Sequence, residues 1–205
     1  MQIISPIKCE NNIGIISLGS PFQIFGAIPL IGSYCRISSN KFFANGVKNL
    51  MLEIDWLDLP QHFADYYEAY NKIYSFTNQS FQVNFSLDTY RSTSFQLINH
   101  DTLSLFTEDP STGNILTKSY FCLDAKDLLL AAKLLSSNED ELLSDKIEWG
   151  IRIELTSPEV GFGHKIFPTL LAETVLNNSK WYKRKRKVPN QPYVPFVNHI
   201  TIYTN

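Results

Sequence analysis

The sequence lacks the segments that are typical of secreted and membrane-spanning proteins. No apolar run approaches the roughly 18 residues that a transmembrane helix needs. The N-terminal segment, MQIISPIKCENN, has neither the basic region nor the apolar core of a signal peptide. We therefore expect a soluble protein that is assembled in the cytoplasm and that leaves the cell only as part of a larger particle.

Cysteine is scarce, and the three residues, Cys9, Cys35 and Cys122, share no close spacing. They cannot all pair with one another, and neither a zinc-binding pattern nor a redox C-x-x-C motif is present. The simplest interpretation is that the thiols are reduced in an intracellular protein.

Recognisable catalytic and cofactor-binding motifs are also missing. There is no G-x-S-x-G nucleophile elbow and no recognisable pairing of carboxylates for acid–base chemistry. The four histidines lie in unrelated contexts without metal-ligand spacing: His62, His100, His164 and His199. The sequence therefore offers no evidence for a catalytic residue, and we expect neither a metal nor a cofactor.

The composition is nevertheless that of a folded globular protein. Of 205 residues, 44% are hydrophobic, 19% are charged and 13% are aromatic. The aromatic content favours β-sheets and protein interfaces. A chain of this length can bury a substantial core, either as one large β domain or as two small ones.

Residues 147–155 carry the clearest pattern in the chain. Polar residues and a glycine alternate there with apolar ones, and a period of two is what a strand with one buried face requires. The apolar positions are Ile147, Trp149, Ile151, Ile153 and Leu155. The pair Ser157-Pro158 ends the pattern, because proline cannot donate a hydrogen bond to a neighbouring strand.

Similar but weaker patterns predict the other elements. Strands are expected around residues 13–18, 33–37, 47–57 and 199–203, with a meander of short strands across 80–123. Helices are expected at residues 61–71 and 164–178, the latter with an apolar face of Ile166, Phe167, Leu170, Leu171 and Val175. Residues 125–136 have good helix propensity, but Leu128–Ala132 is apolar on every side, which leaves open a buried helix or a strand. Residues 137–146 are expected to form an acidic, mobile connection.

Together these elements predict a mainly β (α+β) fold. Residues 1–157 are expected to form a β-sandwich-like body that includes the short aromatic helix at 61–71. Residues 158–205 are expected to add the C-terminal helix, a basic and proline-rich extended tail, and the last strand.

The helix at 61–71 has an aromatic stripe that allows two interpretations. Phe63, Tyr66, Tyr67 and Tyr70 fall at i, i+3, i+4 and i+7, on one helix face. Four aromatic residues on one face could form a ligand-binding box. Packing against the core is the more common role of such a stripe, and we favour it.

A glycine-rich corner follows the strand at 147–155. Gly161, Gly163 and His164 lie between a strand and a helix, but the third glycine of a dinucleotide-binding motif and the G-K-[ST] ending of a P-loop are absent. His164 could act as a base or an anion ligand at a helix N-terminus. We favour a structural corner, in which His164 binds backbone groups and acts as a hinge pin.

The segment KWYKRKRK at residues 180–187 is the one strongly charged region. Its six basic residues leave 12 basic and 20 acidic residues elsewhere, which is a net charge of −8 on the rest of the chain. Such segregation allows phosphate contacts with Trp181 and Tyr182 stacking on bases, or docking on an acidic protein surface. The candidate interface residues are Lys183, Arg184, Lys185, Arg186, Lys187, Pro192, Tyr193 and Pro195, the last three in an arm expected to lie on another subunit.

Four blocks in fixed order carry a resemblance to a known family. They are FGAIPLIGSYCRISSNKFF, LEIDWLDLP with FADYYEAY, IRIELTSPEVGFGHKIFPTLLAETV, and VPNQPYVPFVNHITI. In this order they resemble the large, baseplate J-like wedge subunit of extracellular contractile injection systems and related phage-tail-like particles. The blocks span about residues 21–203. Members of that family are several hundred residues long, so the chain is similar to a C-terminal portion of one.

This resemblance implies a structural, non-enzymatic role. Such subunits pair into wedges, ring the central hub and spike, and couple baseplate rearrangement to sheath contraction. The implied partners are other wedge subunits and the hub, spike and sheath proteins, with no small-molecule substrate and no membrane insertion. The alternative is a nucleic-acid-binding module that uses residues 180–187. If residues 180–205 form a separable arm, their deletion should leave the body folded.

Overall fold

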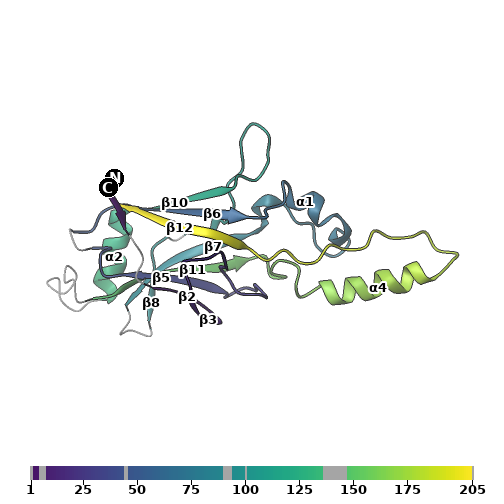
Figure 1. Cartoon of the computed structure of the whole chain (residues 1–205), viewed down its shortest axis with the longest axis horizontal. Coiled ribbons are helices and arrows are strands. Elements are labelled where there is room, and N and C mark those ends of the chain that lie inside the picture. The colour runs from purple at the N-terminus through teal and green to yellow at the C-terminus, as the bar shows by residue number, and fades with distance from the viewer. Residues whose placement is uncertain are drawn as a thin grey trace.

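The computed structural model describes residues 2–4, 8–43, 46–89, 94–99, 101–135 and 147–204. In this part of the chain two antiparallel β-sheets form a sandwich-like body, and a helix with an extended return segment projects from one end (Figure 1). The mainly β fold with short helices is therefore confirmed. His100 and the predicted acidic connection at 137–146 lie outside the described residues.

Sheet A contains the strand predicted at residues 47–57. Leu50, Leu52, Ile54 and Trp56 of that strand all face the core, which confirms its alternating pattern. The sheet has the order β1 (Gln2–Ile4), β12 (Phe196–Thr204), β6 (Leu50–Leu57) and β10 (Lys118–Leu123), with β4 (Phe22–Gln23) paired to β12.

Sheet B is built around β11 (Trp149–Ser157), the strand with the clearest alternation. It lies between two partners in register, so Ile151 pairs with Ile37 on one side and Leu87 on the other. A central position explains why its apolar face is fully buried. The remaining strands are β3 (Gly14–Ile16), β2 (Lys8–Asn11), β5 (Tyr34–Ser39), β7 (Gln82–Thr89), β8 (Phe95–Leu97) and β9 (Leu103–Ser104).

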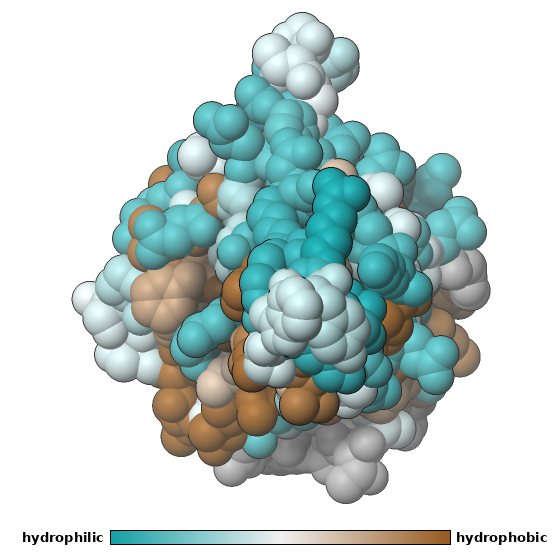
Figure 2. All heavy atoms as spheres, turned by 90° about the vertical axis from the view of Figure 1, so that its right-hand side faces the viewer, coloured by the Kyte–Doolittle hydropathy of each residue, from teal (hydrophilic) through white to brown (hydrophobic). Residues whose placement is uncertain are grey.

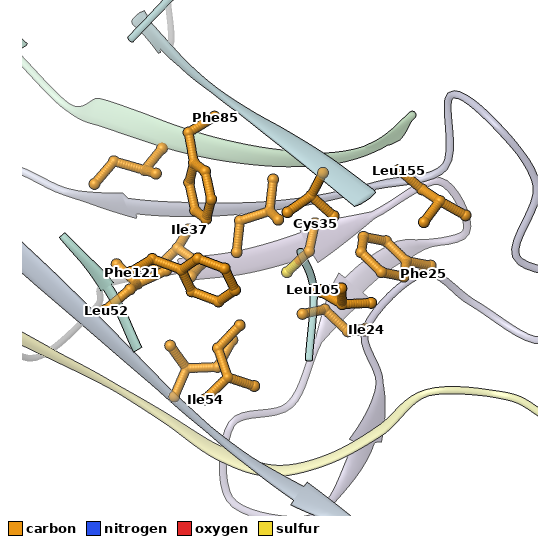
Figure 3. Close-up of a cluster of buried hydrophobic side chains, with 14 of the residues drawn as sticks. Ile24, Phe25, Cys35, Ile37, Leu52, Ile54, Phe85, Leu105, Phe121 and Leu155 are labelled. Carbon is orange, nitrogen blue, oxygen red and sulfur yellow. The ribbon is translucent and has the colours of Figure 1, made fainter. Parts of the chain in front are cut away.

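The core lies between the two sheets. Figure 3 shows Leu52, Ile54 and Phe121 of sheet A beside side chains of sheet B such as Ile37 and Phe85. Burying one such side chain stabilises the fold by about 1.5–3 kcal/mol relative to leaving it exposed. The repeated contribution of these side chains is what joins the sheets.

The predicted meander across residues 80–123 is wrong in part. β7 and β8 form a hairpin, and β9 also pairs with β7, but β10 crosses to sheet A and pairs with β6. In β10, Ser119, Phe121 and Leu123 face the core. Both sheets offer a buried face to such a strand, so the alternation could not show which sheet it would join.

The helices are α1 (Phe63–Tyr66), the 3-10 turns η1 (Glu68–Tyr70) and η2 (Asn78–Ser80), α2 (Ala125–Leu135) and α4 (Phe167–Ser179). The aromatic helix predicted at 61–71 is thus an α-turn followed by a 3-10 turn. α2 settles the alternative at 125–136 in favour of a helix. It buries Leu128, Ala131 and Ala132 but exposes Leu130 and Leu134, so only one of its faces meets the core.

The division between body and tail at residue 157 does not coincide with the packing of the chain. β12, which we grouped with the tail, lies between β1 and β6 in sheet A. Ile202 of β12 is completely buried. Deletion of residues 180–205 would therefore remove a central strand, and the expectation that the body survives this deletion is wrong.

Candidate interaction arm

The segment that leaves the sandwich forms an arm, which we define as residues 161–193, and we call its helix α4 the shaft. Its outgoing leg contains α4, its tip is residues 180–188, and its return leg leads back into β12 (Figure 1). The described residues include all of this arm, so its base, shaft and tip can be considered in turn.

The base begins at the glycine corner, where both glycines are required by the geometry. Gly161 has φ of 60° and Gly163 has φ of 90°, a region that other residues rarely adopt. A Cβ atom on Gly161 would lie 2.5 Å from the carbonyl oxygen of Pro29, and one on Gly163 would lie 3.0 Å from Cε1 of Tyr70. The predicted structural corner is thus present, and its shape follows from close backbone approach.

His164 does not have the role that we expected in this corner. Its Nδ1 atom is buried but has no hydrogen-bond partner among the described residues, so it does not fix the corner by binding backbone. Burial lowers the pKa of its imidazole from the usual 6.5, which favours the neutral form. α4 also begins only at Phe167, beyond His164. The hinge-pin interpretation of His164 is therefore wrong.

Tyr67 joins the two legs of the arm. Its buried hydroxyl donates a hydrogen bond to the carbonyl oxygen of Phe162 at 2.7 Å. The same hydroxyl accepts one from the backbone N–H of Tyr193 at 2.9 Å. Burial raises the pKa of Tyr67 well above its usual value of 10, so the phenol keeps the proton that it donates.

Two further tyrosines from the same stripe hold the return leg. The Tyr70 hydroxyl donates to the carbonyl oxygen of Asn190 at 2.6 Å, and the Tyr66 hydroxyl donates to that of Gln191 at 2.8 Å. The Asn190 side-chain amide donates back to the carbonyl oxygen of Tyr66 at 2.7 Å. We call Tyr66, Tyr67 and Tyr70 the tyrosine clamp. The preference for core packing over a ligand box is confirmed, since Phe63, Tyr67 and Tyr70 are completely buried.

The proline-rich exit lies on its own chain and does not extend toward another subunit. Tyr193 is only 7% exposed, and its hydroxyl donates to the carbonyl oxygen of Leu57 at 3.1 Å. Pro195 is buried as well, and its carbonyl oxygen accepts from Ile24 N–H. The interface assignment of Tyr193 and Pro195 is therefore wrong, because the tyrosine clamp provides the surface that we assigned to a partner. Pro192 remains partly exposed.

Two asparagines at the end of α4 hold the backbone of the tip. The Asn178 side-chain amide pairs with the backbone of Arg186, donating to its carbonyl oxygen at 2.9 Å and accepting from its N–H at 2.8 Å. The Asn177 side chain donates to the carbonyl oxygen of Arg184 at 2.9 Å. The Lys185 ammonium donates to the carbonyl oxygen of Asn178. The backbone of the tip is thus fixed, while the side chains of Lys183, Arg184 and Arg186 are exposed.

The apolar face of α4 differs from the one predicted. Leu170 is buried as expected, but Thr174 and Asn177 are buried too, whereas Val175 and Leu176 are exposed. α4 projects from the sandwich, so only a narrow strip of its surface is covered (Figure 1). Two aliphatic side chains therefore remain in solvent on the shaft.

The tip combines exposed aromatic and basic side chains. Trp181 is 90% exposed and Tyr182 is 65% exposed. Lys187 forms an exposed ion pair with Glu68 at 2.5 Å, which contributes little in water. In the described part of the chain, four basic side chains of the tip form neither an ion pair nor a hydrogen bond: Lys180, Lys183, Arg184 and Arg186. Figure 2 views this end, where hydrophilic atoms surround a pale projecting group and border a hydrophobic patch.

The structure separates the predicted site residues into three groups. Gly161 and Gly163 build the base, Tyr193 and Pro195 are interior, and the basic residues 183–187 form the exposed tip. Sequence reasoning missed the tyrosine clamp and the asparagine pair. The only signals were the Y-Y-x-x-Y spacing and two adjacent asparagines between a helix and a basic run.

Comparison with known proteins adds no relative, since neither a protein-family model nor a curated protein matches the chain. Within the described ranges, no group of three or more His, Cys, Asp and Glu side chains is placed to hold a metal ion. None of the helices in that part of the chain is both long and apolar enough to cross a membrane.

Proposed function

We propose that this protein is a structural, non-enzymatic subunit of the baseplate of a contractile, phage-tail-like injection machine. The arm is its docking element for a neighbouring wedge, hub or sheath protein. The observation that carries the proposal is a firmly held arm whose tip exposes Trp181, Tyr182 and four cations that have no partner among the described residues.

The build of the arm fits a docking element. Trp, Tyr and Arg are the residues that most often dominate the binding energy of protein interfaces. An element that is ordered before binding loses less conformational entropy when a partner arrives. The hydrogen bonds of Tyr67 and Asn178 supply this order at the base and at the tip. The exposed cations favour a partner with an acidic surface.

The motif resemblance is the ground for the baseplate assignment, and its blocks contact one another at the base of the arm. The carbonyl oxygen of Pro29 in the first block lies so close to Gly161 of the third that a Cβ atom there would be 2.5 Å from it. Leu57 of the second block accepts a hydrogen bond from Tyr193 of the fourth. Tyr67 binds both the corner and the exit. Residues from all four blocks therefore contribute to the base of the arm.

Nucleic-acid binding is the second candidate function, and one observation favours it. Cations beside exposed Trp181 and Tyr182 are also what a single-strand-binding surface requires. Binding through phosphates weakens steeply with salt, with a slope that counts the phosphates neutralised. A labelled single-stranded DNA, titrated with the protein at several salt concentrations, distinguishes this function from protein docking.

The proposal is tested by co-expression with the products of adjacent genes, followed by co-purification. The variant K183E/R184E, combined with W181A, changes only exposed side chains of the tip. We expect it to lose sheath, hub or wedge proteins that the wild type retains. The control K41E/K72E makes the same charge change at two exposed lysines outside the arm and should retain them. Equal retention by the tip variant and the control would contradict the proposal.

A further inference from the structure

A second exposed apolar surface lies at the end of the body opposite the arm. α2 and the edge strand β8 enclose a groove of about 380 Å³ between them. In Figure 1 these two elements are at the left end of the molecule and α4 is at the right end. The elements that line the groove and the arm therefore lie at opposite ends of the molecule.

Both walls of the groove are apolar and unusually exposed. Leu130 and Leu134 of α2 are 56% and 64% exposed. Phe95 and Leu97 of β8 form the opposite wall and are about half exposed. Asp127 lies one turn before Leu130 on the same helix face, at the rim of the groove. Continuous apolar surface of this kind, with a polar rim, is typical of a binding site.

The net charge of the chain outside the tip favours a second copy of this protein as the partner. The tip carries six basic residues at 180–187, whereas the rest of the same chain carries a net charge of −8. A copy of this protein therefore offers the tip an oppositely charged body, which favours encounter and orientation. The groove also has room for a large aromatic side chain, and Trp181 is the most exposed large hydrophobic residue described.

We propose that the arm tip of one copy docks into the groove between α2 and β8 of a second copy. Trp181 enters between the leucines of α2 and the wall formed by β8, and Asp127 receives a cation or the indole N–H. This inference rests on the proposed docking function of the arm and names its partner. Because the two surfaces differ and lie at opposite ends, the contact is heterologous and builds a chain or a ring of subunits.

Complementary variants test this head-to-tail arrangement. W181A removes the side chain that enters the groove. L130E places a carboxylate in the groove at a position exposed enough to tolerate it. We expect the wild type to associate with increasing concentration in sedimentation velocity, and each variant alone to remain monomeric. In an equal mixture, W181A supplies an intact groove and L130E an intact tip. The mixture should therefore stop at a dimer, with twice the monomer mass of 23.5 kDa.

Ile15 provides the matched control. It is 77% exposed on the edge strand β3, outside both proposed surfaces, so I15E should associate like the wild type. Loss of association in I15E but not in L130E would overturn the groove as the acceptor. Circular dichroism of each variant establishes that it is folded.

Failure of the inference can be told apart from failure of the proposed function. A wild type that stays monomeric up to about 1 mM, which covers even weak contacts, overturns the inference. If the tip variants still lose baseplate proteins in that case, the docking function stands with a different partner. If the monomeric wild type instead binds single-stranded DNA through Trp181, both are overturned in favour of nucleic-acid binding.

Discussion

Replacing Tyr67 by phenylalanine should destabilise the protein more than any similar change in the aromatic helix. The substitution removes only the hydroxyl and keeps the ring, which stacks on Phe76 with the ring centroids 4.1 Å apart. Two buried backbone groups then lose their partner, the carbonyl of Phe162 and the N–H of Tyr193. A buried polar group left without a hydrogen bond costs roughly 1–3 kcal/mol, so we expect Y67F to lower the free energy of unfolding by about 2–4 kcal/mol.

Urea denaturation of a matched series measures this effect. Y66F removes a hydroxyl whose hydrogen bond to Gln191 is exposed to water, so this substitution should lower the free energy of unfolding by only about 0.5 kcal/mol. Tyr74 makes no side-chain hydrogen bond among the described residues, and Y74F should be close to neutral. If Y67F and Y74F have the same free energy of unfolding, the tyrosine clamp does not join the legs of the arm, and the reasoning is refuted.

Three further predictions concern the corner, the tip and His164. G161A should lower the free energy of unfolding by about 1–3 kcal/mol in the same urea assay, because φ at Gly161 is 60° and the new Cβ would lie 2.5 Å from Pro29 O. G19A should change it little. Equal effects of the two substitutions would contradict the requirement for glycine at the corner. N178A should speed trypsin cleavage at the tip, because the hydrogen bonds between the Asn178 side chain and the backbone of Arg186 are lost, while N71A should not. Unchanged cleavage of N178A would show that these hydrogen bonds do not hold the tip. Since burial lowers the pKa of folded His164, the unfolded state binds the proton more strongly, and stability should fall as pH decreases below about 6.5. H164Q should flatten that pH dependence, and an identical profile would exclude the residue as its source.

The strands could be predicted because their patterns match a simple geometry. β11 and β6 each place every second side chain in the core, and an alternation sustained over eight or nine residues fits a half-buried strand far better than a helix. The sheet that receives a strand could not be predicted in the same way. β10 alternates just as clearly, but its partner depends on a long-range choice between two equally apolar faces.

The base of the arm shows why the site was only partly predictable. Tyr193 in a proline-rich, extended segment has the sequence of an exposed arm, yet it is buried against the aromatic helix. The hydroxyls of Tyr66 and Tyr70 bind backbone carbonyls more than a hundred residues away, and backbone acceptors leave no trace in a sequence. The basic run, in contrast, was recognisable as exposed because unpaired cations are rarely buried.

Cross-linking from the tip in the assembled particle tests the central claim most directly. Trp181 is replaced by a photo-reactive aromatic residue, with Tyr120 of β10, which is 48% exposed, replaced in the same way as a control. The account predicts a cross-link from position 181 to a protein subunit of the baseplate and a much weaker one from position 120. A position 181 that remains uncross-linked in the intact particle, or that couples only to nucleic acid, would contradict it.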